Sequence, residues 1–317
     1  MLTVSPIPSD ILVRPFETRR ILCAFHDIDG THSLIRDWPP VMSIVLDYAE
    51  KSGVPEGYDS MEQVKRLASL AGTKELPVTD AFCIESAGLS ALTQMEWALR
   101  RAVEAGTVCV PCDRKQNREK IARILGGEEV FPEMPDSPEM EAFLAEHTPR
   151  LFVFYEKVLN AFCRDRNLEL AKEHPERFRV PGSLDFLTFL HRNGVKNYFV
   201  TGAVVQKGMG MHEEVVTLGY PIGPGRMVED IIGSTWTEKL PKDVIMQRLA
   251  KQLGLSGAEV LVVGDGRSEI SAGVGMGAVC ISRLAETAVY QRRLHKQLGT
   301  NILIADYNDP RLYAMFS

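Results

Sequence analysis

The sequence has few features of a membrane, secreted or nucleic-acid-binding protein. None of its apolar runs approaches the roughly 18 residues that a membrane-spanning helix needs. Six cysteines in a chain of 317 residues do not form the disulfide framework of a small secreted domain. A formal net charge of −6 offers no basic face to nucleic acid or to an anionic membrane. We therefore expect a protein that binds neither nucleic acid nor a membrane.

The first eight residues lack both the basic segment and the apolar core of a secretory signal, so a cytoplasmic protein is expected. The hydrophobic share of 45% and the charged share of 25% are ordinary for a globular protein. A chain of 317 residues exceeds the usual size of one domain, which favours two domains. The oligomeric state is left open between a monomer and a homodimer.

A short apolar run near the N-terminus ends in two carboxylates. Residues 20–25 predict a buried strand, and Asp27-Ile28-Asp29-Gly30-Thr31 follows it almost directly. Since Asp-Gly is a turn signal, Asp27 is expected at the carboxyl end of the strand, where open α/β sheets bind their ligands. Two aspartates so close together repel each other unless a cation or a substrate group compensates. The stretch predicts a site, with an acidic turn of no function as the plain alternative.

Two kinds of pattern divide the rest of the chain. Residues 33–179 carry apolar side chains at helical spacing and few strand-like runs, which predicts a mainly helical domain. Strands and helices alternate from about residue 180 onward, and this alternation predicts a parallel, doubly wound α/β sheet. We expect residues 1–32 and 180–317 to form this core and residues 33–179 to be inserted into it. The expected helices are 183–192, 204–218, 241–253 and 286–298, and the expected strands are 195–200, 231–233, 260–263, 278–281 and 301–304.

Polar residues lie next to the later predicted strands as well. They are Thr201, Asp265 and Glu269, and a pair of lysines, Lys239 and Lys242, lies in the loop before the predicted helix at Pro241. Because the carboxyl ends of parallel strands meet at one edge, Asp265 and Glu269 are expected near the first two aspartates. Four converging carboxylates favour a hard divalent cation, and Mg²⁺ binds through one or two carboxylates together with substrate phosphate. The sequence therefore predicts a Mg²⁺ site and a phosphorylated substrate.

The ordered set of motifs resembles the haloacid dehalogenase-like hydrolase superfamily. The set consists of Asp27-x-Asp29-Gly30-Thr31, Thr201, Lys239 and Gly264-Asp265-x-x-x-Glu269. The resemblance covers residues 20–32 and about 180–306, and the block 33–179 takes the position of that superfamily's cap domain, inserted after the first strand. It implies a Rossmann-like core and an aspartyl-phosphate mechanism. An aspartate at position 29 is similar to the phosphatases and phosphomutases of the superfamily and unlike its dehalogenases.

The resemblance thus implies an enzyme, a phosphoric monoester hydrolase. We expect a magnesium-dependent phosphatase that acts on a small phosphorylated metabolite, a sugar phosphate being one candidate. The first alternative is a phosphomutase on sugar phosphates that uses the same residues. A catalytically silent binding protein of the same fold is the second alternative.

The resemblance also implies a role for each residue. Asp27 attacks the phosphoryl group, and Asp29 protonates the leaving oxygen and later deprotonates the attacking water. Thr201 and the Gly202 amide hold phosphate oxygens, and Lys239 offsets the charge on the phosphoaspartate. The implied Mg²⁺ ligands are Asp27, Asp29, Asp265 and Glu269, the last of these binding directly or through water.

Some assignments stay open at this point. Lys242 is a rival for the role of Lys239, which we favour because its spacing to Ile245 fits the family pattern. His26 is expected to be a core histidine, since it points away from Asp27 on an alternating strand. Arg36, Arg114 and Lys115 are candidate cations for the substrate. The pair Cys109 and Cys112 is expected to be two ordinary reduced thiols.

Overall fold

The structure is a computed structural model that describes residues 2–235 and 240–317, and these residues form two compact units. The first unit contains residues 2–35, 167–235 and 240–317, and the second contains residues 36–166. The sequence predicts that the second segment of the core begins at residue 180, whereas in the structure the first unit resumes at residue 167. The reason is that helix α7 (Asp165–Glu173) buries Leu168 and Ala171 in the apolar core of the first unit.

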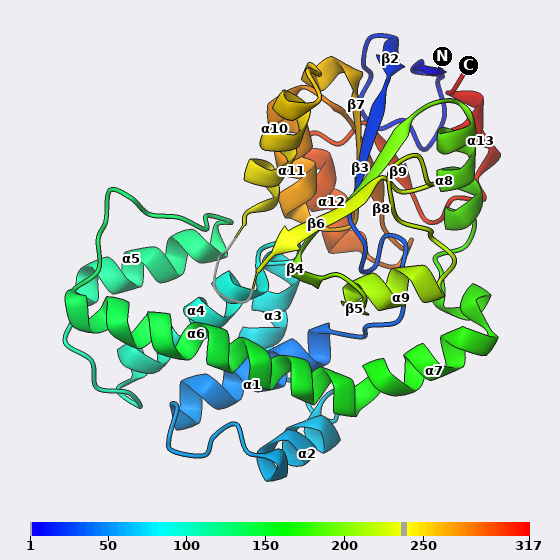
Figure 1. The fold of residues 1–317 in the computed structure, drawn as a ribbon. Coiled ribbons are helices and arrows are strands. Elements are labelled where there is room, and N and C mark those ends of the chain that lie inside the picture. Colours follow the sequence, from blue (N-terminus) through cyan, green and yellow to red (C-terminus); the bar gives the residue numbers. More distant parts are fainter. Residues whose placement is uncertain (1, 236–239) are drawn as a thin grey trace. The chain divides into compact units, whose positions relative to one another are not determined.

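A parallel sheet forms the centre of the first unit (Figure 1). Its parallel strands have the order β6-β4-β3-β7-β8-β9, and the short β5 pairs antiparallel with the end of β4. The strands are β3 (Cys23–His26), β4 (Lys196–Gln206), β5 (Met209–Gly210), β6 (Asp230–Ser234), β7 (Val260–Gly264), β8 (Val279–Arg283) and β9 (Ile302–Ile304). A separate antiparallel pair is formed by β1 (Leu2–Val4) and β2 (Arg19–Ile21).

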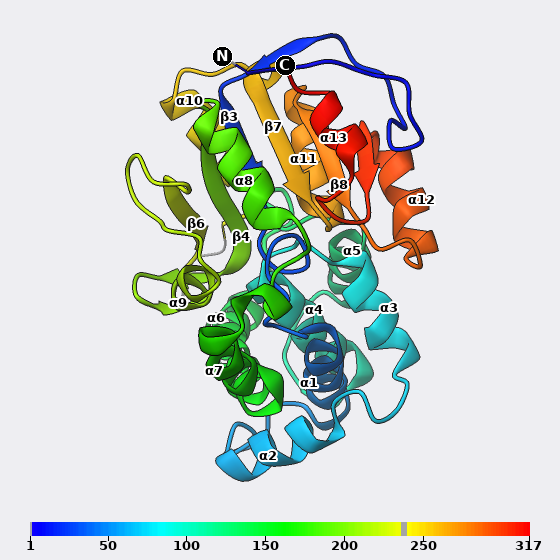
Figure 2. The same cartoon turned by 90° about the vertical axis from the view of Figure 1, so that its right-hand side faces the viewer.

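Helices cover both faces of this sheet (Figure 2). On one face Ile245, Met246 and Ile270 pack against the strand residues Phe25 and Val262. The other face is covered by a second cluster, in which Phe186, Leu190 and Leu312 pack against Leu261 and Val263. The helices of the unit, besides α7, are α8 (Ser183–Arg192), α9 (Met211–Thr217), α10 (Lys242–Gln252), α11 (Arg267–Met276), α12 (Val289–Leu298) and α13 (Pro310–Ala314). The expected doubly wound α/β fold is confirmed.

The helix expected over residues 204–218 is wrong in its first half. Strand β4 continues to Gln206, turns at Lys207-Gly208 and pairs with β5, so that α9 begins only at Met211. The β-branched Val204 and Val205 favour this extended conformation, and Gly208 takes the positive φ of 79° that the turn needs.

The extension of β4 contains a bulge. The pairing with β6 passes from Val200 opposite Ile232 to Val204 opposite Ser234, so that residues 201–203 of β4 stand against a single residue of β6. Gly233 is that residue, and a Cβ there would lie 2.5 Å from the Ala203 carbonyl oxygen. Bulges of this kind redirect side chains and are common beside active sites.

The described residues 36–166 of the second unit form helices joined by loops, with no strand among them. Its helices are α1 (Pro39–Ser52), α2 (Met61–Leu70), α3 (Pro77–Glu85), α4 (Ala91–Ala105), α5 (Arg114–Leu125) and α6 (Pro138–Leu159), followed by a π-helical turn at Asn160–Arg164. Helix α4 packs against α1, α5 and α6. Its Arg100 is only 2% exposed and pairs with Glu96 and Asp136, which satisfies its buried charge. Among the described helices of the chain, none has the length and the apolar character to cross a membrane.

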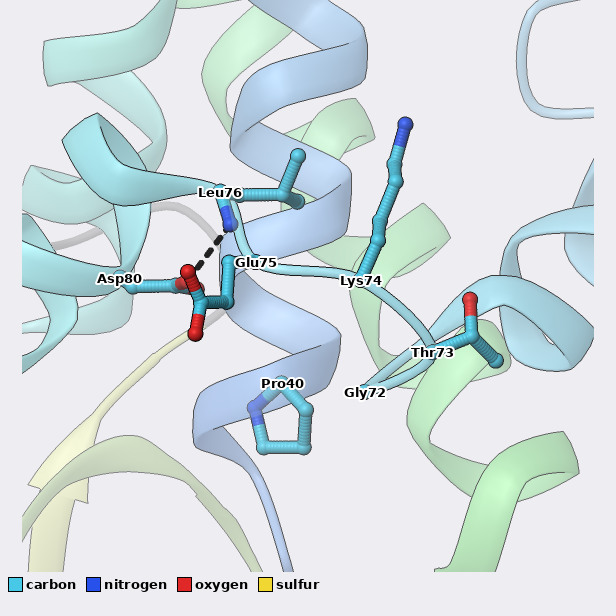
Figure 3. A pocket seen from close by; sticks show the side chains of 7 residues that line it. All are labelled: Pro40, Gly72, Thr73, Lys74, Glu75, Leu76 and Asp80. Carbon is cyan, nitrogen blue, oxygen red and sulfur yellow. Dashed lines mark hydrogen bonds between the residues drawn. The ribbon is translucent and has the colours of Figure 1, made fainter.

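A hollow of about 350 Å³ lies within the second unit (Figure 3). It is lined by Pro40 at the start of α1, by residues 72–76 between α2 and α3, and by Asp80. The Asp80 carboxylate accepts a hydrogen bond from the Leu76 amide at 2.7 Å (Figure 3). None of these residues was predicted from the sequence to take part in the site.

Candidate active site

The parallel register brings the ends of three strands together. His26 of β3 pairs with Phe199 of β4 and with Val263 of β7. The Asp27 amide continues this ladder by donating to the Val263 carbonyl at 2.9 Å. Asp27 therefore lies at the carboxyl edge of the sheet, between β4, which contains Thr201, and β7, which Asp265 follows.

Three carboxylates gather at this edge. Asp27, Asp265 and Glu269 each offer an oxygen, and these oxygens lie within 4.8 Å of one another. Asp27 is 6% exposed and Glu269 is fully buried. Asp29, the fourth predicted metal ligand, does not belong to this group, and its partly exposed side chain stands on the turn that follows.

Glu269 is held in place by its own helix. It lies in the first turn of α11, where its Oε1 accepts a hydrogen bond from the Gly266 amide at 2.5 Å. A negative charge at this end of a helix is stabilised by the helix dipole. Gly264 makes room for the side chain, since a Cβ there would lie 2.2 Å from the Glu269 Cγ.

The turn after the two aspartates closes on Asp265. The Thr31 hydroxyl donates to Asp265 Oδ1 at 2.9 Å. Gly30 has a φ of 74°, and a Cβ at this position would lie 2.1 Å from Asp265 Oδ2. Both the backbone conformation and the close approach therefore require glycine at position 30.

The donor set fits a divalent cation. Burial raises the pKa of Asp265 well above its usual value, and the charges of Asp27 and Glu269 raise it further. Burial also raises the pKa of Glu269, and Lys242 offsets this only in part. Raised pKa values mark negative charge that its surroundings do not compensate, and carboxylate oxygens are the ligands that Mg²⁺ prefers.

The lysine that the structure places at the site is Lys242. Its Nζ lies 2.5 Å from Asp27 Oδ1 and 2.9 Å from Glu269 Oε2, and the side chain is 2% exposed. Burial alone would lower the pKa of Lys242, but the charges of Asp27 and Glu269 raise it above its usual value. Lys242 is therefore protonated at neutral pH. The favoured candidate, Lys239, lies outside the described residues.

Thr201 and Gly202 lie in the bulge of β4. The Thr201 side chain is 4% exposed, and its Oγ1 accepts a hydrogen bond from the Ala203 amide at 3.1 Å. Because the oxygen serves as an acceptor there, the hydroxyl proton can be directed to another acceptor, such as a phosphate oxygen.

Two further residues have structural partners. His26 is fully buried and bonds to Asn197 and to His32, and burial lowers its pKa to about 4. The expectation of a core histidine is confirmed. Arg36 lies in the second unit, where its Nη1 donates to Glu156 at 3.1 Å.

Two residues of the same edge were not predicted from the sequence. Arg283 donates to the Gly30 carbonyl at 2.9 Å, and the Tyr307 hydroxyl donates to the Thr31 carbonyl at 3.1 Å. Arg283 is the last residue of β8, and Tyr307 follows β9 as Asp27 follows β3. The rule that polar residues at strand ends converge, extended to the last two strands, would have pointed to both.

No family model matches the chain, and no curated protein matches it. Several solved structures are similar to it along most of its length. A predicted phosphoglycolate phosphatase from Haemophilus somnus is 15% identical, with a TM-score of 0.46 over 93% of this chain and 98% of its own. A predicted phosphatase from Clostridium acetobutylicum is 10% identical, with a TM-score of 0.49 over 93% and 99%. A beta-phosphoglucomutase from Clostridium difficile is 14% identical, with a TM-score of 0.47 over 93% and 96%.

Proposed function

We propose that this chain is a magnesium-dependent phosphatase of the haloacid dehalogenase-like superfamily that acts on a small phosphorylated metabolite. The observation that carries the proposal is the surrounding of Asp27. This buried carboxylate is bonded to the protonated Lys242 and belongs to a group of three acids that fits a divalent cation. The bulge with Thr201 and Gly202 lies within the neighbouring strand β4. A nucleophile, a group of acids that fits a divalent cation, and donors for phosphate oxygens thus lie at one edge of the sheet.

In the proposed first step, an oxygen of Asp27 attacks phosphorus. The bond from phosphorus to the ester oxygen breaks, and Asp29 gives its proton to that leaving oxygen. Lys242 stays protonated and offsets negative charge at Asp27, while the Thr201 hydroxyl and the Gly202 amide donate to the phosphoryl oxygens. The products are the free alcohol and an aspartyl phosphate on Asp27.

In the proposed second step, Asp29 takes a proton from a water molecule that attacks phosphorus. The bond between phosphorus and Asp27 breaks, inorganic phosphate leaves, and Asp29 is protonated again for the next cycle. Asp27, Asp265 and Glu269 would hold Mg²⁺. Bound there, Mg²⁺ neutralises charge on the carboxylates and on the phosphoryl oxygens.

The second unit would serve as the cap that selects the substrate, with Arg36 as its predicted cation. This role rests on the insertion of the unit after the first core strand and on its helical character. The cytoplasmic location and the monomeric or homodimeric state expected from the sequence stay predictions.

The test is a panel of sugar phosphates and amino-acid phosphates incubated with the protein and MgCl₂. Inorganic phosphate should be released from at least one of them, and EDTA should stop the release. Each reaction is also analysed for isomerised sugar phosphate, which would identify a phosphomutase. No release and no isomerisation across the panel would contradict an enzyme of this kind.

A further inference from the structure

Three consecutive carbonyl groups of the turn after Asp29 are each held by a side chain. Arg283 donates to the carbonyl of residue 30 at 2.9 Å, and Tyr307 donates to that of residue 31 at 3.1 Å. The Tyr220 hydroxyl donates to the carbonyl of residue 32 at 3.3 Å. The three donors come from three parts of the chain that are far from the turn in sequence.

The amide groups of the same turn point inward. The amides of Thr31, His32 and Ser33 all donate to the Ile28 carbonyl, at 3.2, 2.8 and 2.9 Å. The turn therefore closes on itself through its amides and is held from outside through its carbonyls. Because these backbone amides and carbonyls already have hydrogen-bond partners, few polar groups of the turn remain to stabilise a different backbone conformation.

Tyr307 is built into the core as a fixed donor. It is fully buried, and its ring stacks on His32 with centroids 5.1 Å apart and an interplanar angle of 10°. Burial raises the pKa of its hydroxyl well above the usual value, so the group keeps its proton. Arg283 is fixed by a second hydrogen bond, from its Nε to the Ala305 carbonyl at 2.9 Å.

The turn held by these donors includes Asp29 and contacts Asp265, which are two groups of the proposed mechanism. Asp29 directly precedes the first held carbonyl. Gly30 and Thr31 contact the Asp265 carboxylate, the first by its close approach and the second by the 2.9 Å hydrogen bond of its hydroxyl. A shift of this backbone would therefore displace Asp29 and Asp265 together.

We propose that Tyr307 and Arg283 are positioning residues, which hold the turn so that Asp29 reaches the leaving oxygen of the substrate. This inference rests on the proposed function, in which Asp29 is the general acid. Tyr220, which holds the third carbonyl, lies one residue further from the acid and supports the same turn.

A displaced general acid slows different substrates to different extents, whereas a loss of stability slows all of them equally. Protonation of the leaving oxygen matters most when the leaving group is a strong base. Phenyl phosphate and para-nitrophenyl phosphate have similar shapes, but phenoxide is much more basic than para-nitrophenoxide. A displaced Asp29 should therefore slow phenyl phosphate more than para-nitrophenyl phosphate, whereas a smaller folded fraction slows both equally.

The experiment compares kcat/KM for the two esters in the wild type, in Tyr307→Phe and in Arg283→Met. Tyr307→Phe keeps the ring that stacks on His32 and removes only the hydroxyl. The control is Thr188→Val, which removes a hydroxyl bonded to the Leu184 carbonyl at 2.7 Å within α8. Thermal unfolding of each protein is measured alongside.

Tyr307→Phe and Arg283→Met should each raise the preference for para-nitrophenyl phosphate over phenyl phosphate by about tenfold, whereas Thr188→Val should leave the ratio unchanged. An unchanged ratio in Arg283→Met and in folded Tyr307→Phe would overturn this inference while leaving the phosphatase in place. A wild type that hydrolyses neither ester, nor any phosphate of the panel, would overturn the proposed function and this inference with it.

Discussion

The Lys242 ammonium lies 2.5 Å from Asp27 Oδ1, and the two groups face each other from elements 215 residues apart in the chain. Lys242 begins α10, and Asp27 directly follows β3, the first strand of the parallel sheet. The lysine also bonds to Glu269, so that one cation joins two of the three clustered carboxylates. This arrangement holds one oxygen of the Asp27 carboxylate against the Lys242 ammonium.

Replacement of Lys242 by methionine should lower kcat/KM about 100-fold or more, because the charge beside the phosphoryl group is lost. It should also destabilise the protein by about 3 kcal/mol in EDTA, since Asp27 and Glu269 are left as buried charges without their partner. Activity toward para-nitrophenyl phosphate and denaturant unfolding measure the two effects.

Lys251→Met is the matched control for that substitution, because Lys251 is an exposed lysine in the last turn of the same helix. It should change neither quantity. Lys239→Met belongs in the same set, since the sequence favoured Lys239 for this role. Loss of activity in Lys239→Met with normal activity in Lys242→Met would contradict the role given to Lys242.

Gly30→Ala should weaken Mg²⁺ binding about tenfold or more, because the added Cβ would lie 2.1 Å from Asp265 Oδ2 and must displace that carboxylate. Gly194→Ala separates this effect from backbone strain: Gly194 also has a positive φ, of 82°, but a Cβ there would meet no atom within 4 Å. Both variants should lose about 1 kcal/mol of stability from the strained conformation. Calorimetric titration with MgCl₂ gives the affinities, and equal affinities in the two variants would refute the proposed placement of the metal.

The stabilisation of the protein by Mg²⁺ should grow with pH. In the metal-free protein the pKa values of Asp265 and Glu269 are raised, mainly by burial. A group with a raised folded-state pKa stabilises the fold below its unfolded pKa of about 4, and this contribution is lost as the pH rises through the folded value. The cation offsets the charge that then develops.

Melting temperatures with and without MgCl₂ at about pH 5 and about pH 8 test this expectation. The shift produced by MgCl₂ should be larger at the higher pH. Asp265→Asn, which removes one of the charges, should reduce the difference between the two shifts. A shift that is the same at both pH values would show that these carboxylates do not bind the ion.

Much of the fold could be predicted because local signals and long-range packing agree. Helix α8 occupies the predicted residues 183–192, since its apolar period and its stop at Asn193-Gly194 are both local features. Strand β7 and its acidic end followed from a buried β-branched run and a turn at Gly264. The extension of β4 was missed because residues 204–218 have apolar residues at helical spacing, whereas the pairing with β5 and β6 decides the first half.

The candidate site could be predicted in part for the same reason. Asp27 and Asp265 directly follow β3 and β7, Thr201 lies in the bulge of the neighbouring β4, and a parallel register brings such positions together wherever the strands lie side by side. The choice between Lys239 and Lys242 could not be made from spacing, because it depends on the turn of α10 that faces Asp27. The contacts of Arg283 and Tyr307 with the turn span about 250 residues or more of chain, and only the folded chain shows which carbonyl each one meets.

Turnover of para-nitrophenyl phosphate with MgCl₂ tests whether Asp27 is the nucleophile and Asp29 its acid and base. The proteins compared are the wild type, Asp27→Asn and Asp29→Asn, each first shown to be folded by its thermal unfolding. We predict turnover by the wild type, no measurable turnover by Asp27→Asn, and a rate at least about 100-fold below the wild type for Asp29→Asn. Equal rates in all three proteins would contradict the account.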